Sequence, residues 1–375
     1  MIFLLVASYA DSLIPFRGPL LDDLLARGVE VHVAVPEVPP GSALRRSLED
    51  RGLRVHDVPL QRTGMNPWQD CATLLHLWRL KRRIRPTCVL GYTIKPVIYG
   101  TLAASLARVP QRFALITGLG YAFIGERGGG DGRGLLRLLV ERLYALALRS
   151  THKVFFQNPD DQALFRGQGI LGPSTPSCVL NGSGVDLARY RVEPLPATPC
   201  FLLIARLLGD KGVREYVAAA RQVKARFPAA TFNLVGWIDG NPDAIGRDEL
   251  DGWVKEGVVR YFGRLDDVRP AIAAASVYVL PSYREGTPRT VLEAMAMGRA
   301  IVTTDAPGCR ETVVPEENGF LVPVRAVDAL ARAMLRFIDE PALVTRMGAR
   351  SRQIAEEKYD VRRVNARMLQ EMGIQ

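Results

Sequence analysis

Two charged clusters in the second half of the chain have the residue types and the spacing to bind a phosphorylated sugar. The first is Arg206 with Lys211, which follow the apolar run 201–205 and precede a helical pattern that begins at Gly212. Free amides at a helix N-terminus and two cationic side chains together attract a diphosphate. In isolation, the same residues could be ordinary charges in a surface loop.

The second cluster contains two glutamates, Glu285 and Glu293, separated by eight positions. They lie after the strand-like run 276–280, in a loop and in the helix that follows it. A carboxylate accepts paired hydrogen bonds from adjacent hydroxyls, which suits a sugar ring or a ribose diol. Gly286 permits a close approach of the backbone, and the amides after it point at the ligand.

Short apolar strands alternate with helical patterns along the chain, and this predicts parallel sheets covered by helices on both faces. The alternation stops at 189–199, where three prolines in eleven residues predict a stiff linker, and then starts again. The fold class is therefore predicted as α/β, with two doubly wound domains. In such sheets ligands bind beyond the carboxyl ends of the strands, which is where both clusters lie.

Composition limits the possible partners. The chain has 375 residues, is 48% hydrophobic and carries a net charge of +10 with a pI near 9.6. These values exclude a disordered or fibrous protein and favour nucleic acid, an anionic membrane face or a phosphate-bearing molecule as partner. A basic cluster at 79–85 fits either a solvated helix end or a surface that faces anionic lipid.

Targeting and redox signals indicate a cytoplasmic protein. The five cysteines form no C-x-x-C pair, so reduced thiols are expected rather than a zinc site or a disulfide framework. The apolar start lacks a basic region and is interpreted as a first strand rather than a signal peptide. No apolar run reaches about 18 residues, so any membrane contact is expected to be peripheral.

The set Arg206, Lys211 and Glu285-x7-Glu293 resembles the family 4 retaining glycosyltransferases, which have the GT-B architecture of two facing Rossmann-like domains with a central cleft. The resemblance extends over nearly the whole chain. Four further segments are similar to the bacterial subgroup that builds capsular polysaccharides, exopolysaccharides and lipid-linked oligosaccharides: 91–100, 117–120, 156–160 and 181–186.

The resemblance implies a division of labour between the domains. Residues 1–188 would form the acceptor-binding domain, 189–199 the linker and 200–355 the nucleotide-sugar domain, while 356–375 would form a helix that packs back on the first domain. The donor would be a nucleotide sugar, expected to be linked to UDP. The acceptor would be a sugar on a polyprenyl diphosphate, met at the inner face of the cell membrane. Neither a metal ion nor another cofactor is expected, because no D-x-D-like motif is evident.

Residue roles follow from the same resemblance. Arg206 and Lys211 would hold the donor diphosphate, and Glu293 the ribose hydroxyls. Glu285 would hold hydroxyls of the donor sugar together with the backbone of the next three residues, and two further residues would contact the base through backbone atoms. These five residues are Gly286, Thr287, Pro288, Arg264 and Leu265.

The acceptor side is less defined. Lys95 and Arg17 are the candidates that would face a lipid-linked diphosphate, together with Gly118 and Gly120. Many family members have a histidine where this chain has the segment 92–95, so no catalytic base is assigned. Retaining enzymes of this type are thought to use front-face substitution, in which the departing phosphate takes the acceptor proton and the protein supplies positioning and charge.

Three other functions share some of these sequence features. A nicotinamide-dependent dehydrogenase is disfavoured because the third glycine of G-x-G-x-x-G would fall at Phe123. A sugar-nucleotide 2-epimerase shares the architecture and would also bind UDP, so it remains the main alternative. Nucleic-acid binding is disfavoured because no binding module accompanies the basic charge.

Overall fold

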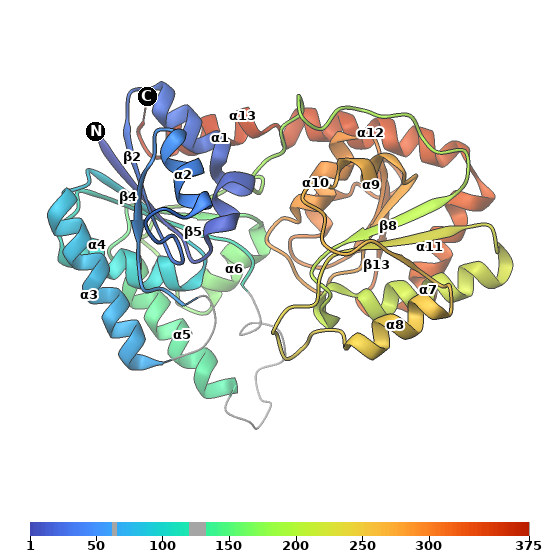
Figure 1. Ribbon diagram of the computed structural model, residues 1–375, viewed down its shortest axis with the longest axis horizontal. Helices are drawn as coiled ribbons and strands as arrows, with labels where there is room; N and C mark the ends of the chain where they lie inside the picture. Colours follow the sequence, from blue (N-terminus) through green and yellow to red (C-terminus); the bar gives the residue numbers. More distant parts are fainter. Residues whose placement is uncertain (62–65, 120–132, 375) are drawn as a thin grey trace. The chain divides into compact units, whose positions relative to one another are not determined.

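The computed structural model describes residues 1–61, 66–119 and 133–374 (Figure 1). Its internal contacts divide the chain into two units. Unit 1 consists of Met1–Ser183 with Val364–Gln375, and unit 2 of Gly184–Arg363. The boundaries predicted from the sequence lie instead at residues 188, 200 and 356.

Unit 1 is built on a seven-stranded parallel sheet with the order β3-β2-β1-β4-β5-β6-β7. Its strands are β1 Ile2–Val6, β2 Glu30–Val35, β3 Arg54–Asp57, β4 Cys88–Tyr92, β5 Gln111–Ile116, β6 Lys153–Phe156 and β7 Ser177–Val179. Its helices are α1 Leu13–Ala26, α2 Ala43–Asp50, α3 Pro67–Ile84, α4 Thr101–Leu106, α5 Arg133–Leu148 and α6 Pro159–Gly167, joined by most of α13 Val361–Glu371 and by the short turns η1 Ala10–Ser12 and η2 Pro96–Gly100.

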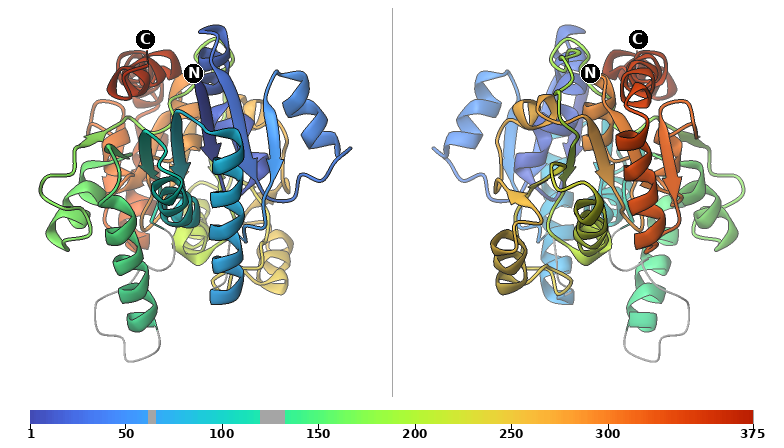
Figure 2. Two further views of the ribbon diagram at one scale, coloured as in Figure 1. Left: turned by 90° about the vertical axis from the view of Figure 1, so that its left-hand side faces the viewer. Right: turned by 90° about the vertical axis from the view of Figure 1, so that its right-hand side faces the viewer.

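The sheet of unit 1 is covered on both faces at its centre, where β1 is apolar at every position. In β1, Phe3 and Leu5 pack into the core under α1, α2 and α13, whereas Leu4 and Val6 pack into the core under α3 and α4. Helices α3 and α4 lie side by side on that second face (Figures 1 and 2). Successive residues of a strand point to opposite faces, so an unbroken apolar run is what a doubly covered sheet requires.

Unit 2 repeats this plan with a six-stranded parallel sheet of order β10-β9-β8-β11-β12-β13. Its strands are β8 Cys200–Ile204, β9 Thr231–Val235, β10 Arg260–Tyr261, β11 Val277–Leu280, β12 Ala300–Thr304 and β13 Gly319–Val322. Its helices are α7 Val213–Arg226, α8 Arg247–Lys255, α9 Arg269–Ala273, α10 Arg289–Ala296, α11 Val327–Asp339 and α12 Ala342–Lys358, with the short turns η4 Gly209–Lys211 and η5 Arg310–Thr312.

The predicted fold class, two doubly wound α/β domains, is confirmed. In each sheet the strand order reverses at one place, between β1 and β4 in unit 1 and between β8 and β11 in unit 2. Loops on either side of such a reversal diverge and leave room for a ligand at the carboxyl ends of the strands. The loops after β8 and β11 carry the charged clusters found in the sequence.

Helix α1 begins at Leu13, and Pro15 falls in its first turn, where a proline costs no hydrogen bond. Segment 189–199, predicted as a stiff linker, belongs to unit 2. The buried guanidinium group of Arg299 donates hydrogen bonds to the carbonyls of Glu193 and Pro194 and fastens the segment to unit 2. Within the described residues, no helix has both the length and the apolar character needed to cross a bilayer.

Candidate active site

In unit 2, the loops that follow β8 and β11 are pressed together by a close backbone contact. Gly212 has a φ of +70°, and a Cβ atom there would lie 2.1 Å from the carbonyl oxygen of Pro281. The position therefore requires glycine for two reasons, conformation and space. The amide of Tyr283 donates to the carbonyl of Asp210 at 2.8 Å and joins the loops further.

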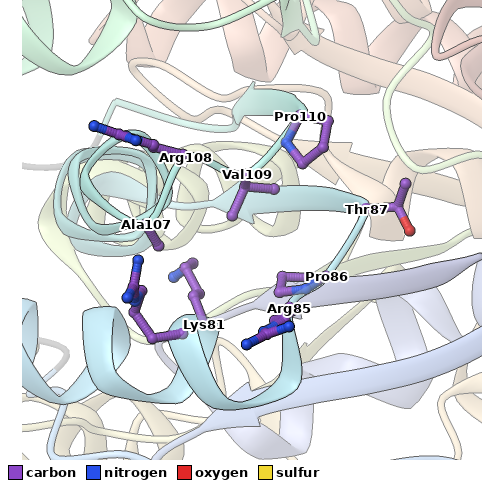
Figure 3. A pocket seen from close by; sticks show the side chains of 9 residues that line it. Lys81, Arg85, Pro86, Thr87, Ala107, Arg108, Val109 and Pro110 are labelled. Atoms are coloured by element: carbon purple, nitrogen blue, oxygen red, sulfur yellow. The ribbon is translucent and has the colours of Figure 1, made fainter.

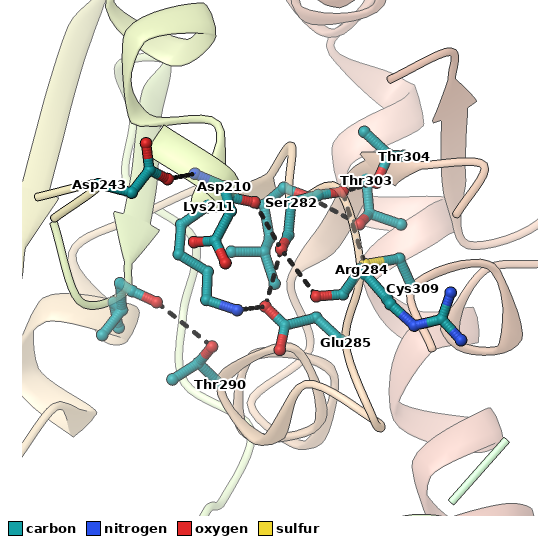
Figure 4. A network of polar contacts seen from close by, with 12 residues as sticks. Asp210, Lys211, Asp243, Ser282, Arg284, Glu285, Thr290, Thr303, Thr304 and Cys309 are labelled. Atoms are coloured by element: carbon teal, nitrogen blue, oxygen red, sulfur yellow. Dashed lines mark hydrogen bonds and ion pairs between the residues drawn. The ribbon is translucent and has the colours of Figure 1, made fainter. Parts of the chain in front are cut away.

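This contact brings Lys211 to Glu285. The Lys211 Nζ atom lies 2.6 Å from the Glu285 Oε1 atom, which also accepts a hydrogen bond of 2.9 Å from the Ser282 hydroxyl (Figure 4). The side chains are only 14% and 18% exposed. Burial disfavours the lysine ammonium, but the nearby carboxylates of Glu285 and Asp210 outweigh that effect and raise the pKa of Lys211.

The backbone of Glu285 is held from behind by the turn that follows β12. The amide of Glu285 donates to the carbonyl of Pro307 at 2.9 Å. Gly308 has a φ of +81°, and a Cβ atom there would lie 2.2 Å from the Glu285 carbonyl oxygen. Two chain segments besides its own loop therefore fix the position of this glutamate, as a site that must hold a ligand in one orientation requires.

Asp210 is a member of the cluster that the sequence analysis did not single out. Its backbone amide donates to Asp243 Oδ2 at 2.8 Å, and its own Oδ1 atom is buried without a hydrogen-bond partner. Burial raises the pKa of the Asp210 carboxyl, with Glu285 and Asp243 adding to the rise and Lys211 opposing it. In the sequence, its position next to Lys211 was the feature that could have indicated that Asp210 belongs to the site.

Arg206, the other predicted diphosphate ligand, is paired with Asp239. Its Nη1 atom lies 2.6 Å from Asp239 Oδ2, in the loop after β9. That loop lies directly against the loop after β8, since a Cβ atom at Gly236 would lie 1.8 Å from the carbonyl oxygen of Ala205. Both cations predicted to hold a diphosphate thus have a carboxylate partner, and a bound diphosphate would share or replace those partners.

Glu293 lies in α10 and is only 5% exposed. Its Oε1 atom accepts hydrogen bonds from the Tyr190 hydroxyl at 2.8 Å and from Arg289 Nε at 2.7 Å. Arg289 precedes Glu293 by four residues, a spacing that places both on one face of a helix and was readable from the sequence. Nothing in the sequence indicated Tyr190, which is 103 positions away.

The remaining nucleotide-side residues lie in the same unit. Gly286, Thr287 and Pro288 form the link between Glu285 and the start of α10, and Gly286 and Pro288 are buried. The guanidinium carbon of Arg264 lies 5.0 Å from the ring centroid of Trp237. Leu265 packs against the core beneath α10 and α12.

In unit 1, two of the four predicted acceptor-side residues surround the reversal between β1 and β4. The Lys95 Nζ atom lies 2.8 Å from Asp70 Oδ1, so this cation is paired rather than free. Arg17 is buried, and its guanidinium carbon lies 5.2 Å from the centroid of the Tyr92 ring at the end of β4.

The backbone at this reversal is unusual. Thr93 has a φ of +71°, and its hydroxyl lies 2.8 Å from the hydroxyl of Ser8, in the loop after β1. A threonine in the left-handed region costs about 1–2 kcal/mol, which indicates a position held by its surroundings. Of the two predicted glycines, Gly118 is exposed just after β5, and Gly120 lies outside the described residues.

Two of the four histidines contact each other in the sheet of unit 1. His32 and His56, on β2 and β3, stack on each other, with His32 Nδ1 2.8 Å from His56 Nε2. Within the ranges that the structure describes, no group of three or more His, Cys, Asp or Glu side chains is arranged to hold a metal ion.

Comparison with known families assigns both halves of the chain. Residues 18–182 match the "Glycosyl transferase 4-like domain" model, and residues 198–340 match the "Glycosyl transferases group 1" model. Together these matches cover most of both units.

Among characterised proteins, the chain is 29% identical over 363 residues to the N,N'-diacetylbacillosaminyl-diphospho-undecaprenol alpha-1,3-N-acetylgalactosaminyltransferase of Campylobacter jejuni, covering 93% of this chain and 92% of that protein. It is 24% identical over 308 residues to the UDP-Gal:alpha-D-GlcNAc-diphosphoundecaprenol alpha-1,3-galactosyltransferase of Escherichia coli, covering 78% of this chain and 77% of that protein.

Solved structures share the fold. The sucrose-phosphate synthase of Thermosynechococcus elongatus superposes with a TM-score of 0.80 at 22% identity, covering 99% of this chain and 98% of that one. Anabaena HepE, solved in complex with UDP, superposes with a TM-score of 0.78 at 19% identity over the full length of both chains.

Proposed function

Since this chain belongs to the family 4 retaining glycosyltransferases, we propose that it transfers a hexose or an N-acetylhexosamine from a UDP-sugar to a sugar linked to a polyprenyl diphosphate. The Campylobacter and Escherichia relatives are named for transfer of such sugars to diphospho-undecaprenol acceptors, and one is named for a UDP-linked donor. The match to the Campylobacter enzyme runs over nearly the whole of both chains, which supports an acceptor of the same chemical class.

One observation carries the proposal: the pairing of Lys211 with Glu285 across the two loops at the strand reversal of unit 2. A lysine fixed beside a helix N-terminus suits a diphosphate, and a carboxylate beside it suits sugar hydroxyls. Placing the two groups 2.6 Å apart matches a donor in which the diphosphate is bonded directly to the sugar.

The reaction would proceed on one face of the sugar. The bond from the sugar carbon to the phosphate oxygen breaks, the acceptor hydroxyl oxygen bonds to that carbon on the same face, and the departing phosphate oxygen takes the hydroxyl proton. Lys211 and Arg206 would stabilise the negative charge that develops on the departing diphosphate. We propose that these cations serve where other enzymes use a metal ion.

The acceptor would meet unit 1. Lys95 and Arg17 lie at the reversal of its sheet and would offer positive charge to the lipid diphosphate. Helix α5 exposes Leu138, Leu139 and Leu146, apolar side chains suited to a membrane surface. The proposed location is therefore the cytoplasmic face of the membrane, with peripheral attachment.

A two-stage experiment tests the proposal. First, a panel of UDP-, GDP- and TDP-sugars and NAD is screened for a rise in unfolding temperature, and a UDP-sugar is expected to give the largest rise. Second, that donor is incubated with a polyprenyl-diphosphate-linked sugar, and the anomeric configuration of the product is determined by NMR. Transfer with retention supports the proposal, and inversion or the absence of transfer to any lipid-linked acceptor contradicts it.

The same assay without acceptor addresses the epimerase alternative, which the comparisons do not support. A 2-epimerase would convert the donor to its epimer without acceptor, whereas a transferase would leave it intact or hydrolyse it slowly. The comparisons also give no indication of nucleic-acid binding.

A further inference from the structure

Unit 1 contains a second cationic feature, which lies at the amino ends of its strands. Lys95, in contrast, follows the carboxyl end of β4. A pocket of about 390 Å³ lies between the end of α3 and the connection from α4 to β5 (Figure 3). Thr87 and Pro110 on its wall immediately precede β4 and β5, so the pocket lies at the amino ends of these strands. The residues that line it are Lys81, Arg82, Arg85, Pro86, Thr87, Ala107, Arg108, Val109 and Pro110.

All of the charged residues that line the pocket are cationic. Four of the nine lining residues are cationic and none is acidic. Among the described residues, Lys81, Arg82, Arg85 and Arg108 take part in no ion pair. The pocket volume falls in the range of small-molecule sites, and an anion is the ligand that its charge favours.

Lys81 distinguishes this pocket from an ordinary row of solvent-exposed basic residues. Its side chain is 1% exposed, and its Nζ atom is buried without a hydrogen-bond partner. Figure 3 shows the side chain rising from α3 toward Ala107 and Val109. A lysine that only capped the helix would donate to a carbonyl of the last turn, whereas this ammonium donates to none.

Two of the arginines are kept at backbone positions that favour glycine. Arg85 ends α3 with a φ of +49°, and Arg108 follows α4 with a φ of +57°. Glycine is the usual residue at such helix ends because it adopts this conformation without strain. Two arginines in strained conformations on the wall of one pocket indicate that their side chains serve a purpose there.

We propose that this pocket binds a phosphate group, with the Lys81 ammonium as its buried donor and Arg85 and Arg108 at its mouth. Phosphate oxygens accept several charge-assisted hydrogen bonds, and guanidinium groups match their geometry. The site is separate from the proposed reaction, because it lies at the amino ends of the strands whereas the predicted acceptor-side residues follow their carboxyl ends.

The protonation of Lys81 supports the assignment. Burial lowers the pKa of Lys81 to about 7, and the charged groups on the pocket wall are the arginines of α3 and of the α4–β5 connection, Arg82, Arg85 and Arg108. A bound phosphate would supply the missing counter-charge and favour the ammonium form.

The test uses the full chain at pH 7 and the variant Lys81→Met, in which an apolar side chain of similar length replaces the lysine. Binding of inorganic phosphate and of pyrophosphate is measured by calorimetry and by the rise in unfolding temperature, with chloride at matched ionic strength. The variant is expected to bind at least about tenfold more weakly, as loss of one charge-assisted hydrogen bond implies. Without ligand, it is expected to unfold at a higher temperature because a buried charge has been removed.

Two further variants keep the test decisive. Arg85→Gly/Arg108→Gly relieves the strained backbone and should fold at least as well as the parent, yet bind phosphate more weakly. Arg79→Ala removes an exposed charge of α3 outside the pocket and should bind as the parent does. Equal binding by the parent and Lys81→Met, or an equal loss in Arg79→Ala, overturns the proposal. Binding at the diphosphate site of unit 2 would instead persist in Lys81→Met and disappear in Lys211→Met.

Co-sedimentation with vesicles distinguishes the sources of the phosphate. Phosphatidylglycerol vesicles are compared with phosphatidylcholine vesicles for the parent and Lys81→Met. If the parent protein co-sediments with phosphatidylglycerol vesicles and Lys81→Met does not, the phosphate belongs to a lipid headgroup. If only inorganic phosphate or pyrophosphate distinguishes the two proteins, the ligand is a soluble phosphate. If neither probe distinguishes them, the proposal is wrong.

Discussion

The Lys211 ammonium lies 2.6 Å from the Glu285 carboxylate, although the two residues belong to loops 74 positions apart in the chain. The pair forms because β8 and β11 are neighbours in the sheet and Gly212 lets their loops touch. It gives the proposed site its charge balance before any substrate is bound, and each charge depends on the other for its stability.

The first prediction concerns this pair. Glu285→Gln and Lys211→Met should each lower the rate of transfer at least about a hundredfold, because each removes charge aimed at the donor. Both side chains are mostly buried in the structure. Their burial predicts a loss of about 1–3 kcal/mol for each single change, measured by urea unfolding, since the remaining charge loses its partner.

The double variant Lys211→Met/Glu285→Leu is the control. It should recover part of the lost stability while remaining inactive. A stability loss equal to the sum of the two single changes would show that the pair is not coupled.

The second prediction concerns Glu293. Glu293→Gln should raise the donor KM about 10- to 100-fold with little effect on the acceptor KM, as loss of charge-assisted hydrogen bonds to a ribose implies. Tyr190→Phe, which removes one partner of the same carboxylate, should have a much smaller effect. Steady-state kinetics with each substrate varied in turn measures both, and a larger change in acceptor KM than in donor KM would exclude the ribose role.

The third prediction concerns Lys95. Lys95→Ala should raise the acceptor KM far more than the donor KM, because the lysine would face the lipid diphosphate. Asp70→Asn frees Lys95 from its partner and serves as the matched change. It should alter the acceptor KM while sparing the donor KM. A donor-specific effect of Lys95→Ala would remove Lys95 from the acceptor side.

The fourth prediction concerns pH and the His32–His56 stack. Burial, with His32 and nearby arginines, lowers the pKa of His56 to about 4 from the ordinary value near 6.5. Because the pKa is lower in the folded protein, the unfolded chain takes up the proton at a higher pH than the folded protein does as the pH falls. The stability contributed by neutral His56 is therefore complete above pH 6.5 and is lost as the pH falls to 4.

Urea unfolding at pH 7.5 and pH 5 measures this effect. When the pH falls from 7.5 to 5, the free energy of unfolding of His56→Gln should decrease by about 1 kcal/mol less than that of the parent, after allowance for solvent screening. His76→Gln changes an exposed histidine and should behave as the parent does. If His56→Gln and the parent lose the same stability, the low pKa is refuted.

The fifth prediction concerns metal removal. Because Arg206 and Lys211 would neutralise the departing diphosphate, EDTA should leave the initial rate within about twofold of the untreated value. Restoration of a lost rate by added Mg²⁺ or Mn²⁺ would contradict the proposed role of the two cations.

The sequence was sufficient to predict the fold and the loops that carry the site. The apolar runs of β1 and β8 alternate with helices at intervals that only a doubly covered parallel sheet accommodates, and the charged clusters follow strands. Short elements such as α8 and β13 give only a weak periodic signal in the sequence, because they contain few residues.

The partners of the site residues could not be predicted from the sequence. Asp239 with Arg206, Asp70 with Lys95 and Tyr190 with Glu293 are all tertiary contacts, and no local pattern encodes them. The burial of Lys81 could not be predicted from the sequence either. A run of basic residues at a helix end favours a solvated interpretation, yet the packing of α4 against α3 buries one of them.

The division of the chain has a consequence for its biosynthesis. Unit 1 takes its last segment from beyond unit 2, and Met368, Leu369 and Met372 of that segment lie in the same core as Phe3 and Leu5. A ribosome therefore completes all of unit 2 before it supplies the residues that close the core of unit 1. The core of unit 1 can therefore be completed only after unit 2 has been synthesised, although most of unit 1 is made first.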